Sequence, residues 1–299
     1  MKLFRHGARG KEKPGICLPN SDHVDTSSFG EDFDEAFFET DGLIRLSNWC
    51  KDHQKDCPKI DQVKRFGPPV RRPSKIICIG LNYSDHARET KATVPPEPVL
   101  FFKSTTALSG PNDPVTIPKT SQKTDWEVEL AVVVSRKASY IEEKDAADHI
   151  AGYLLHNDYS ERAFQIERSG QWVKGKSCDT FAPIGPYLVT QDEIGDINNL
   201  RLWLSVNGKL MQDGNTNNMV YKVPFLISYI SQFMTLLPGD IISTGTPAGV
   251  GMGQKPEPFY LNAGDIVELG IDHLGTARQK LVSWEESIAT EKNKTALEI

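Results

Sequence analysis

Short apolar runs separated by turn residues dominate the chain from about residue 70 onward. Runs rich in β-branched and aromatic residues predict strands, whereas apolar residues at helical spacing predict fewer helices, most clearly at residues 142–149 and 223–236. Strands and helices do not alternate, so the pattern disfavours a doubly wound parallel sheet and predicts a strand-dominated α+β fold. The seven expected strands lie at residues 75–81, 99–103, 127–135, 150–157, 200–206, 240–244 and 266–271.

The first 70 residues follow a different pattern. They are polar, broken by Gly and Pro, and contain only short apolar stretches such as residues 36–38 and 43–46. Residues 65–73 concentrate Pro and Arg, and each proline disfavours helix at the residue before it, so an extended connector is expected there. We therefore predict three parts: a small N-terminal domain (1–70), a main domain (71–285) and a polar C-terminal tail (286–299).

The composition narrows the class of protein. The chain has 299 residues, of which 38% are hydrophobic and 25% charged, as in an ordered globular protein. Its net charge of −6 would repel nucleic acid and anionic membranes, so neither is an expected partner. No apolar run reaches about 18 residues, and the start turns polar at once, so we expect a cytoplasmic protein. Five cysteines without a C-x-x-C pair indicate reduced thiols.

Two glutamates head the most informative apolar run. In a strand, Glu127 and Glu129 would share one face with their Cα atoms roughly 6 to 7 Å apart. Neighbouring buried carboxylates repel each other unless one is protonated or a cation lies between them. A third acid, Asp158, ends another apolar run, and three oxygen ligands without cysteine suit Mg²⁺ or Mn²⁺. The alternative is an edge strand with solvated glutamates.

A histidine and a glutamate follow the first strand of the main domain. His86 and Glu89, three residues apart, would be neighbours on one helical turn. A carboxylate beside an imidazole fixes its tautomer and raises its basicity, as a general base for water requires. The competing interpretation is a solvated helix face.

Residues 170–177 match the phosphate-binding pattern G-x-x-x-x-G-K-[ST]. We reject a nucleotide site because no apolar strand precedes the pattern and no helix follows it, while Trp172 and Val173 are bulky for a phosphate cradle. Lys176 remains of interest as a cation near the acids. A second glycine-rich stretch, residues 243–253, opens no helix, so we interpret it either as a loop that admits a small anion or as a plain turn.

Taken together, these motifs closely resemble the fumarylacetoacetate hydrolase family. The resemblance covers about residues 73–283, and the most similar subgroup is that of fumarylacetoacetate hydrolase domain-containing protein 2 and its bacterial relatives, which include hydrolases of 2,4-diketo-3-deoxy sugar acids. It is carried by Gly80-Leu81-Asn82-Tyr83 with His86 and Glu89, Glu127-Val128-Glu129, Asp158 with Arg162 and Gln165, Gly175-Lys176-Ser177, and Thr244-Gly245-Thr246-Pro247.

The resemblance implies a mixed β-sandwich roll with a small N-terminal domain, a Mg²⁺ or Mn²⁺ ion and a homodimer. Carried over residue by residue, it assigns the metal to three acids, water activation to two residues on a segment that can order as a lid, and stabilisation of negative charge to a lysine. Substrate contacts would come from three further residues. The metal ligands would be Glu127, Glu129 and Asp158, and the water-activating pair would be His86 and Glu89. The charge-stabilising lysine would be Lys176, and the substrate contacts would be Arg162, Gln165 and Thr246.

The implied activity is hydrolysis of a 2,4-diketo acid of the acylpyruvate type. Water deprotonated by His86 would attack the C4 carbonyl, and cleavage of the C3–C4 bond would release pyruvate enolate and a carboxylic acid. The ion would act as a Lewis acid at the C2 oxygen, and Lys176 would stabilise the same charge. Alternatives on the same site are oxaloacetate decarboxylase, 2-hydroxyhepta-2,4-diene-1,7-dioate isomerase and ureidoglycolate lyase. A non-catalytic metal-dependent binding protein would not need His86 or Glu89.

Overall fold

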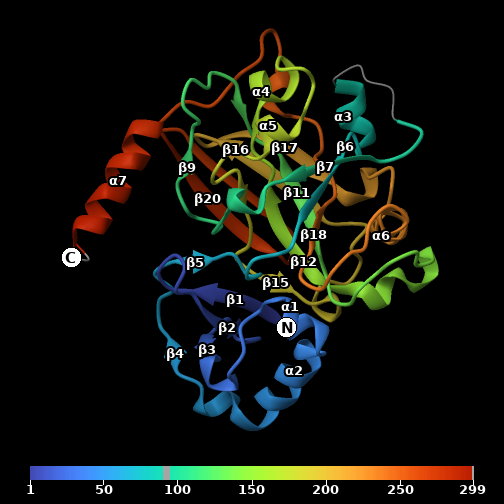
Figure 1. Cartoon of the computed structure of the whole chain (residues 1–299), viewed down its shortest axis with the longest axis vertical. Helices are drawn as coiled ribbons and strands as arrows, with labels where there is room; N and C mark the ends of the chain where they lie inside the picture. Colours follow the sequence, from blue (N-terminus) through green and yellow to red (C-terminus); the bar gives the residue numbers. More distant parts are fainter. Residues whose placement is uncertain (90–94, 298–299) are drawn as a thin grey trace.

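An eleven-stranded sheet runs through the whole molecule in the computed structural model, which describes residues 1–89 and 95–297 (Figure 1). Its strands follow the order β4-β3-β2-β1-β15-β12-β11-β18-β6-β7, and β5 pairs with β1. All of its pairs are antiparallel except β18 with β6. The strands are β1 (Lys2–His6), β2 (Lys13–Cys17), β3 (His23–Asp25), β4 (Lys59–Ile60), β5 (Phe66–Gly67), β6 (Ile76–Gly80), β7 (Val99–Lys103), β11 (Val128–Val134), β12 (Ile150–Asn157), β15 (Leu188–Val189) and β18 (Ile241–Ser243).

The middle of this sheet is buried on both faces. Every residue of β11 and of β12 is buried, as expected for near-continuous runs of Val, Leu and Ile. Strand β11 pairs with β12 on one side and β18 on the other. It is therefore a central strand, and the alternative of an edge strand with solvated glutamates is wrong.

A second, five-stranded sheet packs beside the first. Its order is β17-β16-β19-β20-β9, and both β16 and β19 contact β11. Two short ladders, β10 with β13 and β8 with β14, complete the strands. The bounds are β8 (Leu108–Ser109), β9 (Val115–Thr116), β10 (Thr124–Asp125), β13 (Ser160–Glu161), β14 (Ala182–Pro183), β16 (Arg201–Val206), β17 (Lys209–Asn215), β19 (Ile266–Ile271) and β20 (Gly275–Val282).

The helices are short and lie around the sheets. The segment predicted as a helix at residues 142–149 is a 3₁₀ helix, Glu143–His149, and the helix predicted at 223–236 ends at Ser231. It ends early because Leu236 exchanges backbone hydrogen bonds with Ala138, which requires extended chain there. The α-helices are α1 (Glu35–Glu39), α2 (Gly42–His53), α3 (Ser84–Glu89), α4 (Arg162–Ile166), α5 (Val173–Lys176), α6 (Val223–Ser231) and α7 (Trp284–Leu297).

The N-terminal part is joined to the rest of the molecule by sheet pairing. Strand β1 pairs with β15, with Leu3 opposite Leu188, so the main sheet continues into the blue region of Figure 1. His23 Nε2 also lies 2.7 Å from the Tyr187 hydroxyl across this junction. The division into domains at residue 70 remains a prediction.

Each of the seven predicted strands contains an observed strand, so the strand-dominated α+β class is confirmed.

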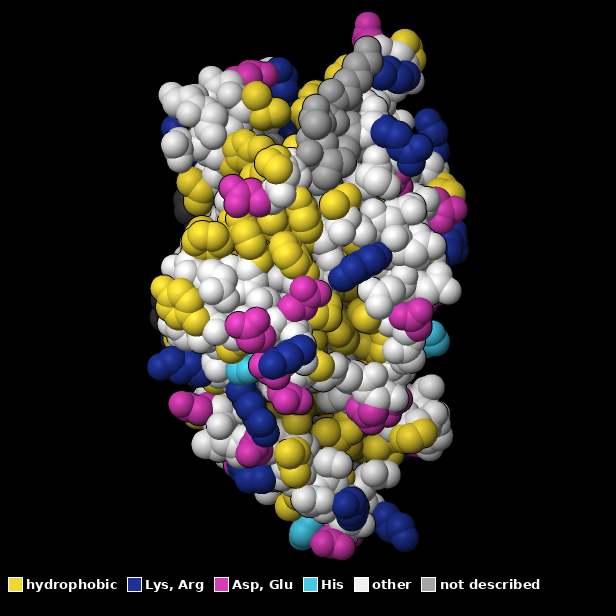
Figure 2. Space-filling view, turned by 90° about the vertical axis from the view of Figure 1, so that its right-hand side faces the viewer, with side chains coloured by type: hydrophobic (Ala, Val, Ile, Leu, Met, Phe, Trp, Pro, Cys, Tyr) yellow, Lys and Arg dark blue, Asp and Glu magenta, His cyan; other side chains and the backbone are white. Residues whose placement is uncertain are grey.

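The polar tail forms α7, the red helix at the edge of Figure 1. All five cysteines are free thiols. Hydrophobic side chains gather on the face shown in Figure 2. Among the helices of the described residues, none combines the length and apolar character that a membrane span requires.

Candidate metal and catalytic site

Three buried carboxylates meet where β11 begins and β12 ends. Glu127 directly precedes β11, Glu129 is its second residue, and Asp158 directly follows β12. The two strands are antiparallel with Val128 opposite Asn157, so the start of one lies beside the end of the other. One oxygen from each carboxylate lies within 4.8 Å of the others. The structure therefore brings together the acids that the pattern singled out.

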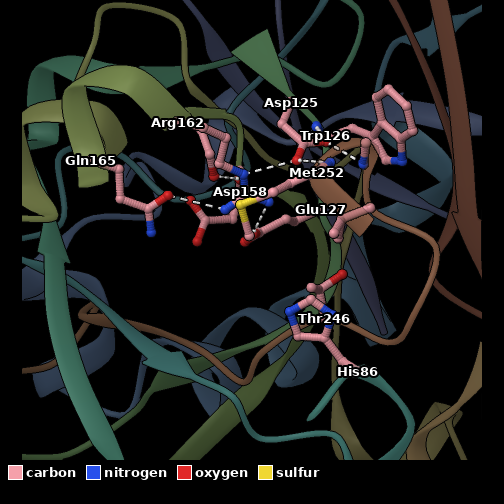
Figure 3. A network of polar contacts seen from close by, with 12 residues as sticks. His86, Asp125, Trp126, Glu127, Asp158, Arg162, Gln165, Thr246 and Met252 are labelled. Atoms are coloured by element: carbon pink, nitrogen blue, oxygen red, sulfur yellow. Dashed lines mark hydrogen bonds and ion pairs between the residues drawn. The ribbon is translucent and has the colours of Figure 1, made fainter. Parts of the chain in front are cut away.

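Three cations are packed against these carboxylates, and one of them, Arg162, is labelled in Figure 3. Lys176 Nζ lies 2.6 Å from Glu127 Oε2 and 2.8 Å from Asp158 Oδ2. Lys103 Nζ lies 2.5 Å from Asp158 Oδ1 and donates to the Tyr159 carbonyl. Arg162 Nη2 forms an ion pair of 2.7 Å with Glu127 Oε1. Both oxygens of Glu127 and both of Asp158 therefore contact a cation.

These contacts set the charge states of the site. Burial alone would raise the pKa of Asp158, but the Lys103 and Lys176 ammonium groups outweigh it and hold that pKa below its ordinary value. The pKa of Lys176 is raised, because Asp158 and Glu127 outweigh the effect of burial. Burial, followed by the Asp158 charge, raises the pKa of Glu129 well above its ordinary range. In this cluster Glu129 is thus the carboxylate that most needs a further positive charge.

Glu129 is held by neutral groups. Its Oε2 accepts hydrogen bonds from the Ser243 hydroxyl and from the Gly245 N–H at 3.0 Å. Ser243 Oγ in turn lies 2.7 Å from Nδ1 of His156. Burial lowers the pKa of His156 to about 3, so this imidazole is neutral at pH 7.

His86 and Glu89 contact each other on α3, as their spacing predicts. His86 Nδ1 lies 3.2 Å from Glu89 Oε2, and Glu89 Oε1 accepts the Gly249 N–H at 2.9 Å. His86 is 7% exposed, so the competing interpretation of a solvated helix face is wrong for this residue. The prediction that the segment carrying His86 and Glu89 orders as a lid stays a prediction, and residues 90–94, which follow it, lie outside the described residues.

The glycine-rich loop binds carboxylates of the protein itself. Backbone N–H groups of Gly245, Gly249 and Gly251 each donate to a side-chain carboxylate. Gly249 has a φ of +107°, and a Cβ there would lie 2.0 Å from the Met211 carbonyl, so this close approach requires glycine. The loop therefore fixes carboxylates of the site: Glu129, Glu89 and Asp125.

Of the three residues predicted to contact substrate, Arg162 and Gln165 bind each other, whereas Thr246 binds other residues. Arg162 Nε lies 2.8 Å from Asp125 Oδ2, and Arg162 Nη1 donates to Gln165 Oε1 at 3.1 Å. Thr246 donates to the Val128 carbonyl and accepts from Gln212. In Figure 3, Gln165 is drawn at one side of the network and Thr246 with His86 at the other.

The sequence that resembles a phosphate-binding loop serves to deliver Lys176. Residues 162–166 before it are helical, and Lys176 ends the single-turn helix α5. A Cβ at Gly175 would lie 2.3 Å from the Glu161 carbonyl, so glycine allows α5 to pack closely and direct Lys176 inward. Lys176 is 2% exposed and binds carboxylates, which agrees with rejection of a nucleotide site.

Sequence reasoning missed four polar residues of this network. Lys103 closes an apolar run whose other residues are aliphatic or aromatic, and a charge in that position was a usable signal. Asp125 stands two residues before Glu127, which was a weaker signal. His156 and Ser243 carry no local pattern, because only the strand pairing brings them to Glu129.

Comparison with known proteins identifies the family. The model of the fumarylacetoacetate hydrolase C-terminal region matches residues 75–282. The chain belongs to the fumarylacetoacetate hydrolase family. It is 47% identical over 285 residues to 2,4-didehydro-3-deoxy-L-rhamnonate hydrolase of Sphingomonas sp. strain SKA58, which covers 95% of this chain and 97% of the relative.

Solved structures of the family share the fold. Fumarylacetoacetate hydrolase from Exiguobacterium antarcticum has a TM-score of 0.82 at 32% identity, over 95% of this chain and 99% of that chain. Maleylpyruvate hydrolase from Sphingobium sp. SYK-6, solved with a manganese(II) ion and pyruvate, has a TM-score of 0.78 at 27% identity, with the same coverage. The predicted family and fold are thereby confirmed.

Proposed function

We propose that the protein hydrolyses the C3–C4 bond of a 2,4-diketo acid to pyruvate and a carboxylic acid, with a bound divalent metal ion. The observation that carries this proposal is the meeting of Glu127, Glu129 and Asp158 within 4.8 Å, with Lys176 against two of them. The predicted enzyme class, a hydrolase of C–C bonds in keto acids, is confirmed by the family and by its named hydrolases.

The donor set fits a hard divalent cation. Three buried carboxylate oxygens without a sulfur ligand suit Mg²⁺ or Mn²⁺. Glu127, Glu129 and Asp158 would hold the ion, which would supply Lewis-acid chemistry at the substrate C2 oxygen. Manganese(II) is present in the structure of maleylpyruvate hydrolase. The identity of the bound ion, Mg²⁺ or Mn²⁺, is part of our proposal.

His86 and Glu89 would activate the attacking water. Glu89 accepts the Gly249 N–H with one oxygen and contacts His86 Nδ1 with the other, so its position is fixed from two sides. With a proton on Nδ1 held by Glu89, Nε2 of His86 is the nitrogen that can take a proton from water. Proton removal from water is needed for hydrolysis but not for decarboxylation. This contact therefore favours hydrolysis over the oxaloacetate decarboxylase alternative.

The buried cations would stabilise the negative charge of the reaction. Lys176 keeps its proton because its pKa is raised by Asp158 and Glu127, and it would donate to the enolate oxygen as the C3–C4 bond breaks. Arg162, Gln165 and Thr246 would contact the substrate or support the residues that do. All four of these side chains are at least 95% buried.

The substrate tail follows from the relatives. The relative at 47% identity is named for a 2,4-didehydro-3-deoxy sugar acid, so we propose a 2,4-diketo-3-deoxy sugar acid for this chain. The isomerase and ureidoglycolate lyase activities remain alternatives.

We further propose a homodimer, from the family resemblance, and a cytoplasmic location. The absence of nucleic-acid and membrane partners remains a prediction.

Product analysis tests this function. The metal-free protein, reloaded with Mg²⁺ or Mn²⁺, is given a panel of acylpyruvates, 2,4-diketo-3-deoxy sugar acids and oxaloacetate. We expect pyruvate and an equimolar carboxylic acid from at least one diketo acid, and loss of this activity with chelator. Pyruvate and CO₂ from oxaloacetate alone would contradict the proposal and favour the decarboxylase.

A further inference from the structure

We propose that His156 and Ser243 are positioning residues that hold Glu129 so that it offers one defined oxygen to the metal ion. The proposal rests on the metal site of the proposed function and extends it to two residues that do not touch the ion. Neither residue was predicted from the sequence, and neither belongs to the family motifs above.

The three side chains converge from three adjacent strands of the central sheet. Glu129 on β11 lies directly opposite His156 on β12, and Ser243 ends β18 on the other side of β11. Directly opposite residues of an antiparallel pair share a face. All three are at most 1% exposed. Water therefore does not compete for their hydrogen bonds.

The direction of the hydrogen bonds follows from the chemistry of Glu129. A metal-ligating carboxylate is ionised and only accepts hydrogen bonds, so Ser243 donates its single hydroxyl proton to Glu129 Oε2. Ser243 Oγ must then accept from His156 Nδ1, 2.7 Å away. His156 is thereby fixed as the tautomer with its proton on Nδ1, and it orients the serine hydroxyl toward the carboxylate.

This arrangement selects the oxygen that is left for the ion. Glu129 Oε2 already accepts two hydrogen bonds, from Ser243 and from the Gly245 N–H. Within residues 1–89 and 95–297, no donor contacts Oε1, whereas both oxygens of Glu127 and of Asp158 contact cations. Glu129 Oε1 is therefore the oxygen whose charge is least neutralised by the protein. Holding Glu129 through neutral donors preserves that charge for the metal ion.

The second nitrogen of His156 supports a role other than stability for the imidazole. Nε2 is buried and has no hydrogen-bond partner among the described residues, and an unsatisfied buried polar atom destabilises the folded state. A leucine would avoid this cost. The position is thus explained by what Nδ1 does for Ser243, and a leucine there should weaken metal binding without weakening the metal-free fold.

Calorimetric titration of the metal-free full-length protein with Mn²⁺ tests the proposal. We expect Ser243→Ala to weaken Mn²⁺ binding about 10- to 100-fold, as is typical for groups that orient metal ligands. Ser243→Thr keeps the hydroxyl and should bind nearly as the wild type does. His156→Leu should also weaken binding, whereas His156→Asn retains a donor near the place of Nδ1 and should restore it.

Thermal melting of the metal-free variants separates this role from a structural one. We expect His156→Leu to melt at or above the wild-type temperature while its Mn²⁺ affinity falls. If Ser243→Ala does not fold, the His156→Leu and His156→Asn pair carries the test. Wild-type Mn²⁺ affinity in His156→Leu and in any folded Ser243→Ala protein would overturn the positioning role alone. A wild type that binds no divalent ion would overturn the proposed function as well.

Discussion

Lys176 reaches Asp158 with its Nζ atom 2.8 Å from Oδ2, and both side chains are almost completely buried. The same Nζ lies 2.6 Å from Glu127. One ammonium group thus links two of the three carboxylates and keeps its proton, because these acids raise its pKa. A lysine that stays charged in a buried site can stabilise an enolate without any rearrangement.

Removal of this charge should affect turnover more than binding. We expect Lys176→Met to lower kcat for diketo-acid hydrolysis about 10²- to 10³-fold, the usual effect of removing one donor to a developing oxyanion. Steady-state kinetics of pyruvate release measures this. Lys174→Met, on the exposed side of the same short helix, is the matched control and should keep wild-type kcat. An unchanged kcat in Lys176→Met would exclude the assigned role.

Metal removal should lower thermal stability in a way that depends on Glu129. A ligand that binds only the folded state adds about 2.7 kcal/mol of stability at 100 times its Kd, so Mn²⁺ should raise the Tm of the metal-free protein. Glu129→Gln should lose most of this rise. Glu268→Gln, at a glutamate whose side chain is 43% exposed, should keep it. Equal rises in all three proteins would show that Mn²⁺ binds elsewhere.

Asp125 should be important for stability although it lies outside the carboxylate triad. It accepts hydrogen bonds from Arg162 and from the N–H groups of Gly251 and Met252. Breaking a buried ion pair on one side typically costs about 3 to 5 kcal/mol. We expect Asp125→Asn to lose about 3 kcal/mol in denaturant unfolding, compared with little change for Asp179→Asn at an exposed position. A stable Asp125→Asn protein would show that Arg162 does not need this partner.

The junction between the N-terminal part and the main sheet should be sensitive to acid. Burial lowers the pKa of His23, and the Asp22 carboxylate only partly offsets this. The unfolded chain therefore takes up a proton near the ordinary pKa of about 6.5 before the folded protein does. Stability from this group is present above that pH and is lost as the pH falls below it. Tm measured from pH 7.5 to 5 should fall less steeply in His23→Phe than in the wild type, and identical slopes would contradict this.

Local pattern was sufficient to place Glu127 beside Glu129 and His86 beside Glu89, whereas the roles proposed for these residues, and the place of Asp158 among them, came from the family resemblance. Two glutamates two residues apart in a β-forming run must share a face, and His86 and Glu89 must meet on one helical turn, whatever the rest of the chain does. The central strands were predictable for the same reason, because their apolar runs are continuous. In these cases the spacing of the residues along a strand or a helical turn determines which side chains are neighbours.

Contacts that depend on tertiary pairing were not predictable. His156 and Ser243 stand 87 positions apart, and they meet near Glu129 only because β12 and β18 flank β11. Lys103 reaches Asp158 across 55 positions. The glycines of residues 243–253 predicted a loop with a flexible backbone. The carboxylates that its N–H groups bind, Glu89 and Asp125, could be identified only from the structure.

Substitution of His86 tests the central claim most directly. Pyruvate release from a 2,4-diketo acid is measured with His86→Ala and with wild-type protein at the same metal loading, with His53→Ala, at an exposed position, as control. General-base catalysis typically contributes 10²- to 10⁴-fold, so we predict that kcat of His86→Ala falls at least about 100-fold while Mn²⁺ affinity stays at the wild-type value. Wild-type hydrolysis by His86→Ala would contradict the account.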